Sequence, residues 1–251
     1  MVLLLLVDLD PGLAALRPLG GFFLLRTAGV PRPSLPTLAR AYEGGSSDVY
    51  GDVLNFRVHK VADTLRAPEV RIAASVAHQG LAARLWSVAL GCAALYGRIP
   101  DLDARLLHWD PDGSAPDDLW LSEVRPLPGD TATVVDAVLR GHLEPLTAAL
   151  RARHRLARGL LWGNAASALA GAARQLDRWA QANGRTEAAA RTRSLTADLL
   201  AHPLLAGTGT LTGTAFRRRS CCLYYQVPGG GICGDCCFTR PPRSSPRGPS
   251  G

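Results

Sequence analysis

The sequence contains little lysine, few aromatic residues and no long hydrophobic run. Aromatic residues make up 6% of the 251 residues, so a hydrophobic core must be built mainly from Leu, Ala and Val. Lys60 is the only lysine, and arginine supplies nearly all of the positive charge. The apolar run 85–96 is shorter than the roughly 20 residues that a membrane-spanning helix needs. We therefore expect no transmembrane segment, although the 47% of hydrophobic residues suffices for a folded core.

The first residues lack the features of a secretory signal. The apolar run 2–7 has no basic residue before it, and Asp8 and Asp10 follow it directly. We therefore expect a cytoplasmic protein, with transient association at a membrane surface still possible. Free cysteines stay reduced in that compartment, and clusters of them bind metals or carry out redox chemistry.

Several catalytic signatures are also absent. The chain has no H-E-x-x-H zinc motif, no G-x-S-x-G elbow and no GK[ST] after the glycines of 207–213. None of the six histidines has the spacing of a metal-ligand pair, which favours surface or core roles for them. The sequence therefore predicts no catalytic side chain beyond a possible metal centre.

Positive charge is concentrated at the C-terminal end. Residues 206–251 contain six arginines and one aspartate, a net charge of +5, whereas the first 205 residues contain 22 basic and 20 acidic side chains, a net charge of +2. A nucleic-acid-binding domain usually carries a basic stripe along a helix or face. The nearly neutral body therefore argues against nucleic acid as a partner.

Hydrophobic periodicity predicts a mainly α fold with a small β element (α+β). Helical patterns cover residues 49–65, 69–96, 130–139, 142–158, 160–182 and 186–200. Two short apolar runs around the turn residues 111–113 predict a β-hairpin at 104–125.

Composition divides the chain into four parts. Residues 1–40 contain many prolines and are predicted to be irregular. Residues 41–205 form the helical body, and residues 206–240 form a C-terminal segment that carries most of the cysteines. Residues 241–251 are Pro, Ser, Gly and Arg, and are predicted to be a disordered tail.

The cysteines are the most informative residues of the sequence. Five of the six fall within seventeen residues, at Cys221, Cys222, Cys233, Cys236 and Cys237. Cys92 stands apart in an apolar helical stretch and is predicted to be a small buried hydrophobic residue. Clustered thiols in a reducing compartment indicate a metal site.

Two kinds of metal centre fit this cluster. Structural zinc sites usually present two separated cysteine pairs, and neighbouring side chains such as Cys221 and Cys222 tend to point apart, which makes them a poor chelate for one ion. A two-iron cluster offers two centres, so adjacent cysteines can each find a position. The pattern favours an iron–sulfur cluster, with zinc as the alternative.

The cysteine segment resembles a known family. The run Arg-Arg-Ser-Cys-Cys-Leu-Tyr-Tyr at 218–225, followed by Pro228 and by Cys-Gly-Asp-Cys at 233–236, resembles the C-terminal signature of FhuF-type ferric-siderophore reductases. Ten residues separate Cys222 from Cys233 and two separate Cys233 from Cys236, as in that family. Weaker similarity at 85–86, 142–146 and 161–164 extends the resemblance over about residues 40–240.

The resemblance implies a cofactor, a reaction and partners. It implies a [2Fe-2S] cluster on Cys221, Cys222, Cys233 and Cys236, and an enzyme that reduces siderophore-bound ferric iron in the cytoplasm. The partners would be a ferric siderophore and an electron donor, either a reduced ferredoxin or a flavoprotein. The alternatives are a zinc-stabilised interaction module and an iron–sulfur electron carrier or regulator that does not act on siderophores.

Cys237 departs from the family pattern, because it follows Cys236 directly. We expect Cys236 to be the ligand, since the two-residue spacing is kept, and Cys237 to be an unligated thiol.

Further candidates surround the cysteines or lie in the body. Arg217, Arg218 and Arg219 are candidates for tuning the cluster or docking the electron donor, with a solvated strand edge as the alternative. At most two of the three can face the cluster, because alternate residues of an extended segment point to opposite faces. Trp162 and Asn164 are candidates for a substrate pocket in the body, with helix packing as the alternative for Trp162.

Overall fold

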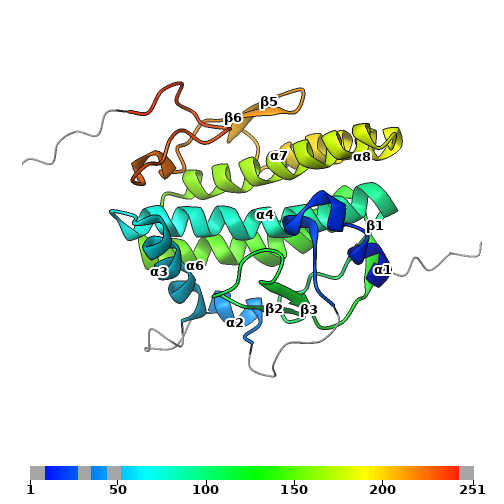
Figure 1. Ribbon diagram of the computed structural model, residues 1–251, viewed down its shortest axis with the longest axis horizontal. Coiled ribbons are helices and arrows are strands. Elements are labelled where there is room, and N and C mark those ends of the chain that lie inside the picture. The colour runs from blue at the N-terminus through cyan, green and yellow to red at the C-terminus, as the bar shows by residue number, and fades with distance from the viewer. Residues whose placement is uncertain (1–8, 28–34, 44–51, 243–251) are drawn as a thin grey trace, which may run out of the picture.

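The computed structural model describes residues 9–27, 35–43 and 52–242. Two long helices, α4 (Val70–Tyr96) and α7 (Arg158–Ala182), lie against each other through the centre of the molecule (Figure 1). The helices α3 (Val53–Leu65), α6 (Glu144–His154) and α8 (Thr186–Leu200) pack around them. The mainly helical fold with a small β element is confirmed.

The helix α4 is apolar on nearly all sides, as expected of a helix at the centre of a fold. Trp86 is fully buried, and its indole Nε1 donates a hydrogen bond to the carbonyl oxygen of Ala165 in α7 at 3.1 Å. Cys92 is also fully buried, as predicted, and burial raises the pKa of its thiol to about 12. The helix ends at Gly97, which takes the left-handed conformation common at helix C-termini.

The helices predicted at 130–139 and 142–158 are continuous. α5 (Thr131–Val134) begins after Asp130, whose carboxylate accepts a hydrogen bond from the Thr133 amide at 2.9 Å. It leads into a π-helical stretch, η3 (Val135–Leu143), which passes directly into α6. His142 is fully buried and contacts the Tyr42 hydroxyl and the Leu102 carbonyl, so it has the core role predicted for it.

Three antiparallel strand pairs are present in the described part of the chain. β2 (Leu107–Trp109) pairs with β3 (Leu119–Leu121), which is the predicted hairpin. β1 (Arg98–Pro100) pairs with β4 (Pro126–Pro128) at the base of this hairpin, a pairing that the sequence did not indicate. β5 (Gly209–Thr212) and β6 (Ala215–Arg218) form a second hairpin, which leads into the cysteines.

The described part of the N-terminal region contains short helices rather than irregular chain alone. These are α1 (Leu9–Ala14), η1 (Arg17–Leu19) and η2 (Gly21–Phe23), and α2 (Leu38–Glu43) follows them. Leu13, Leu16 and Phe23 are buried in the main core, so this region belongs to the body. The tail predicted at 241–251 lies almost wholly outside the described residues.

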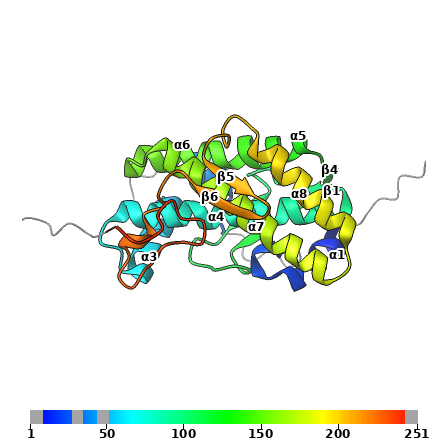
Figure 2. The ribbon, with the colours of Figure 1, turned by 90° about the horizontal axis from the view of Figure 1, so that it is seen from above.

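The C-terminal segment lies on the body at one end of the long helices. It passes over the first half of α7 and reaches the neighbourhood of α3 and α4 (Figures 1 and 2). Within the described ranges, no helix has both the length and the apolar character needed to cross a membrane.

One ion pair is buried between α4 and the loop that follows β2. Arg84 Nε donates to Asp118 Oδ1 at 2.9 Å, and the two side chains are only 2% and 7% exposed. Arg84 Nη1 also donates to the carbonyl oxygens of Gly21 and Phe22, so this guanidinium joins α4 to both the loop and the N-terminal region.

We expect the Asp118→Ala variant to lose about 3–5 kcal/mol of unfolding free energy, because it leaves the Arg84 charge buried without its partner. Urea unfolding followed by circular dichroism measures this loss. The control is Asp136→Ala, which breaks an exposed pair with Arg140 and should change stability little. Equal losses in the two variants would contradict the role given to the buried pair.

Candidate metal centre

The loop 223–232 folds back and brings the cysteines on its two sides together. The Sγ atoms of Cys222 and Cys233 are 3.6 Å apart. Cys221 lies within electrostatic reach of Cys236 and Cys237. The structure therefore gathers the five clustered cysteines at one site, and all of them are free thiols.

Backbone N–H groups of other residues donate hydrogen bonds to four of the sulfur atoms, including Cys222 from Tyr224 and Cys233 from Asp235. The Leu223 amide donates to Cys221 Sγ at 3.2 Å, and the Phe238 amide donates to Cys236 Sγ at 3.4 Å. Such bonds favour the thiolate, the form in which cysteine binds metals. Among the described residues no hydrogen bond from another residue's backbone N–H reaches Cys237 Sγ, which distinguishes it from Cys236.

The thiols of Cys222 and Cys233 are hydrogen-bonded to each other. Their hydrogen bond lowers the pKa of Cys222 to about 6 and raises the pKa of Cys233. Burial raises the pKa of Cys221 to about 11. Because metal ions bind thiolates, a metal centre formed here must displace the protons that the metal-free thiols retain.

The segment is fixed to the body by Arg218, which is only 2% exposed. Its Nη2 donates to Asn164 Oδ1 at 2.6 Å and to the Leu160 carbonyl at 3.3 Å, both on α7. Its Nη1 donates to Gln79 Oε1 on α4 at 3.4 Å. Arg218, at the end of β6 and just before the cysteines in sequence, therefore bonds to both central helices.

A second chain of hydrogen bonds leads from the same place to a candidate ligand. Asn164 is fully buried, and its Nδ2 donates to the carbonyl oxygen and the hydroxyl of Ser75 on α4. The Ser75 hydroxyl donates to the Cys222 carbonyl at 2.8 Å. The cysteine segment also approaches α7 closely at Gly163. A Cβ atom at this position would lie 2.2 Å from Ser220 Oγ, so the close approach requires glycine.

Asp235, between the last two candidate ligands, anchors the far end of the segment. Its carboxylate accepts hydrogen bonds from Ser167 Oγ at 2.7 Å and from Arg174 Nη2 at 3.0 Å, both on α7. Its carbonyl accepts from the Arg218 amide at 2.9 Å. No role was predicted for Asp235 from the sequence. The available signal was its position as the one acidic residue of a basic segment.

The other predicted site residues are placed as follows. Arg217 and Arg219 are exposed, whereas Arg218 is buried, which is the alternation expected of a strand. Arg217 Nη2 also donates to the Cys237 carbonyl at 3.3 Å.

Trp162 and Asn164, the two candidates for a substrate pocket, are 5% and 0% exposed. Asn164 therefore supports the cysteine segment, and the suggested substrate role of this pair remains a prediction.

The donor set at this site consists of cysteine sulfurs, which are the ligands of iron–sulfur clusters. Cys222 and Cys233 form one close pair, and Cys221 lies within electrostatic reach of Cys222, Cys237 and Cys236. Four cysteine ligands shared between two irons is the usual arrangement of a [2Fe-2S] cluster.

Comparison with known proteins agrees with this chemistry. Residues 99–219 match the family described as "Ferric iron reductase FhuF-like transporter", and residues 218–238 match the "FhuF 2Fe-2S C-terminal domain". A search of curated proteins found no match. The second family match identifies the cofactor as a [2Fe-2S] cluster. The two matches overlap at residues 218 and 219 and together span residues 99–238, more than half of the chain, which therefore belongs to the FhuF-like ferric iron reductase family.

Proposed function

We propose that this protein reduces siderophore-bound ferric iron to ferrous iron by one-electron transfer and so releases iron in the cytoplasm. We assign the cluster ligands to Cys221, Cys222, Cys233 and Cys236. One observation carries the proposal. The site where Cys222 and Cys233 lie in contact is attached to a helical body by the buried Arg218–Asn164 hydrogen bond, in a chain of this family. The segment is too short to enclose both a cluster and a siderophore, so the body supplies the substrate site.

The reaction needs no acid–base pair. Ferric iron is a hard cation that oxygen donors hold very tightly, whereas ferrous iron is held far more weakly, so a single electron makes the complex labile. The [2Fe-2S] cluster supplies that electron when it is bound. Cys221 and Cys236 keep their backbone donors, and Arg218 places a buried positive charge beside the sulfurs.

The electron donor is proposed to be a reduced ferredoxin or a flavoprotein with an acidic surface. Arg217, Arg219 and Arg240 are exposed around the cysteine segment, so this side of the molecule is basic. Charge complementarity of this kind chiefly raises the rate of encounter between partners.

The function is tested in a single turnover without oxygen. We expect chemically reduced protein to be reoxidised by a ferric siderophore, with one ferrous ion captured by a ferrous-specific chelator for each cluster oxidised. The Cys222→Ser variant, lacking an intact cluster, should release none. A colourless protein that contains one zinc ion, or a reduced cluster that ferric chelates do not reoxidise, would overturn the proposal.

The ligand assignment is tested by two neighbouring substitutions. Cys237→Ser should leave iron content, acid-labile sulfide and the absorption spectrum nearly unchanged, because Cys237 Sγ lacks the backbone donor that Cys236 Sγ has. Cys236→Ser should lose or reshape the cluster. The opposite result in the two variants would show that Cys237 is the ligand.

The arginines are tested by redox titration. A nearby cation favours the more negatively charged, reduced cluster, so Arg218→Gln should lower the midpoint potential by on the order of tens of millivolts. Arg218→Lys keeps the charge and should restore most of the potential. Arg217→Gln and Arg219→Gln should have smaller effects that fade at high salt, because these residues are exposed.

Unchanged potentials in all three glutamine variants would contradict a tuning role. If Arg217→Gln and Arg219→Gln then slowed reduction by the donor alone, the exposed arginines would have the docking role.

A further inference from the structure

The metal centre is open to solvent on the side of Cys233. Cys222 is buried, and its carbonyl oxygen accepts a hydrogen bond from Ser75 on the body, whereas Cys233 is only half-buried. The chain around Cys233 forms an open loop, residues 228–234, whose exposed members are Pro228, Gly229, Gly231, Ile232 and Gly234. A second protein can therefore approach the centre from this side without displacing the body.

Two glycines of the open loop leave the surroundings of Cys233 uncovered. Gly230 is needed for packing, because a Cβ atom there would lie 2.6 Å from the carbonyl oxygen of Tyr224. A Cβ atom at Gly231 or Gly234 would meet no atom within 4 Å, and neither residue has a positive φ angle. Glycine costs conformational entropy wherever the fold does not require it. Close approach of another molecule gives these two glycines a reason that the fold itself does not supply.

Ile232 places an exposed apolar side chain in this opening, directly before Cys233 in the chain. It is 41% exposed and is one of three exposed large hydrophobic side chains among the described residues. The half-buried rings of Tyr225 and Phe238 lie edge to face with their centroids 5.8 Å apart, and they add apolar surface to the same segment. An apolar contact of this kind is typical of the centre of a protein interface.

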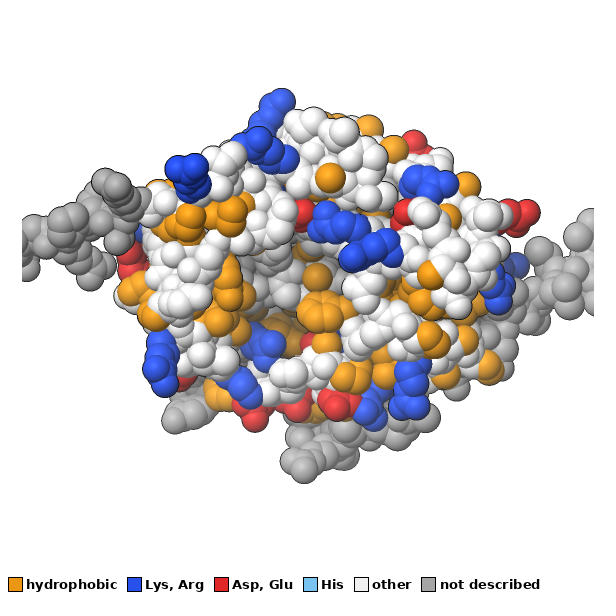
Figure 3. Space-filling model, turned by 45° about the horizontal axis from the view of Figure 1, so that its top comes forward, with side chains coloured by type: hydrophobic (Ala, Val, Ile, Leu, Met, Phe, Trp, Pro, Cys, Tyr) orange, Lys and Arg blue, Asp and Glu red, His pale blue; other side chains and the backbone are white. Residues whose placement is uncertain are grey.

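In the described part of the cysteine segment, all exposed charges are positive. Asp235, the one acidic residue of the segment, is buried and paired with Arg174 of α7. Hydrophobic and basic side chains lie around a hollow on the face that carries the segment (Figure 3). The segment therefore suits a partner with an acidic surface. Its exposed charged residues are Arg217, Arg219 and Arg240.

We propose that the open loop is the docking surface for an acidic ferredoxin, with Ile232 as the central apolar contact and Cys233 as the ligand nearest the donor. A ferredoxin delivers one electron at a time, which matches the one-electron reduction of a [2Fe-2S] cluster. The ferredoxin is oxidised as the cluster is reduced, and no bond forms or breaks. This inference rests on the proposed function, since it locates the electron donor of that reaction.

Plant-type ferredoxin, a small acidic protein, is the probe. Its binding to the cluster-containing protein is measured by calorimetry with both proteins oxidised, so that no electron is transferred. We expect Ile232→Ser to weaken binding about fivefold or more at low and at high ionic strength, because salt does not screen an apolar contact. Arg217→Gln should weaken binding at low ionic strength only, because its charge is exposed.

Electron transfer tests the glycine opening separately. Gly231→Leu adds a side chain beside Cys233, so a docked ferredoxin cannot come as close to the cluster. We expect this variant to slow reduction by ferredoxin more than reduction by dithionite, a small reductant that needs no docking surface. Iron content and the absorption spectrum of Gly231→Leu and Ile232→Ser should match those of the unmodified protein, which shows that the cluster is intact.

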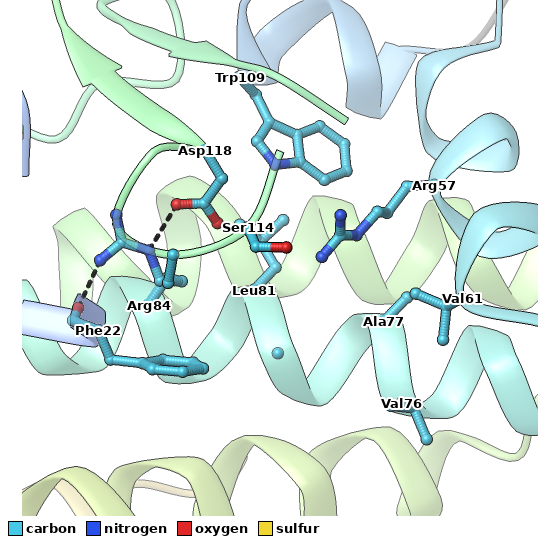
Figure 4. A pocket seen from close by; sticks show the side chains of 12 residues that line it. Phe22, Arg57, Val61, Val76, Ala77, Leu81, Arg84, Trp109, Ser114 and Asp118 are labelled. Atoms are coloured by element: carbon cyan, nitrogen blue, oxygen red, sulfur yellow. Dashed lines mark hydrogen bonds and ion pairs between the residues drawn. The ribbon is translucent and has the colours of Figure 1, made fainter. Parts of the chain in front are cut away.

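Two matched controls lie at a cavity of about 300 Å³, whose walls come from α3, α4, β2 with the loop after it, and the N-terminal region (Figure 4). Phe22 lines this cavity and is 43% exposed, so Phe22→Ser removes an equally exposed hydrophobic side chain away from the open loop. Gly80 and Val76 line it from α4, and a Cβ atom at Gly80 would meet no atom within 4 Å. Phe22→Ser and Gly80→Leu should bind ferredoxin and accept its electron as the unmodified protein does.

Unchanged ferredoxin binding in Ile232→Ser, or equal weakening in Phe22→Ser, would overturn the docking surface. If ferredoxin does not bind the unmodified protein, the assigned partner is wrong, whether or not an acidic flavodoxin binds instead. If the variants behave as expected but ferric siderophores do not reoxidise the reduced cluster, the docking inference stands and the proposed function fails.

Discussion

The docking of the cysteine segment depends on the buried guanidinium of Arg218. The segment has few apolar residues of its own, so it cannot form an independent core and must take its shape from the body. The side-chain acceptors of Arg218 are the neutral amides of Asn164 and Gln79, and the Asp235 carboxylate is bonded to Ser167 and Arg174 instead. A buried cation without an anionic partner is unfavourable. The adjacent thiolates supply negative charge, so metal binding and docking of the segment should stabilise each other.

The helix α4 connects this centre with the cavity on its other side. Its first half presents Ser75 and Gln79 to the segment, and Val76 and Gly80 to the cavity. The second half is packed into the core, where Trp86 bonds to α7. The position of α4 is therefore fixed along its whole length.

Local sequence patterns predicted the secondary-structure elements that depend mainly on interactions between residues near in sequence. The helical periods and the hairpin of β2 and β3 follow from side-chain spacing and turn residues, and the structure has them. The π-helical stretch and the pairing of β1 with β4 had no such signal, because both depend on how distant residues pack. Asn164 illustrates the same limit. It was a candidate for a substrate pocket and stays one, whereas its bonds to α4 and β6 could not be read from the local sequence.

The sequence by itself determined the chemistry of this protein. The spacing of Cys221, Cys222, Cys233 and Cys236 is a local property of the chain. It favoured an iron–sulfur cluster over zinc, and its resemblance to a known family implied a [2Fe-2S] cluster. Tertiary structure alone decided which arginine is buried, which acid anchors the segment, and that Arg57, Gly80 and Trp109 line one cavity. Residues far apart in the chain meet only when the core packs, and their burial sets the strength of their charges and hydrogen bonds.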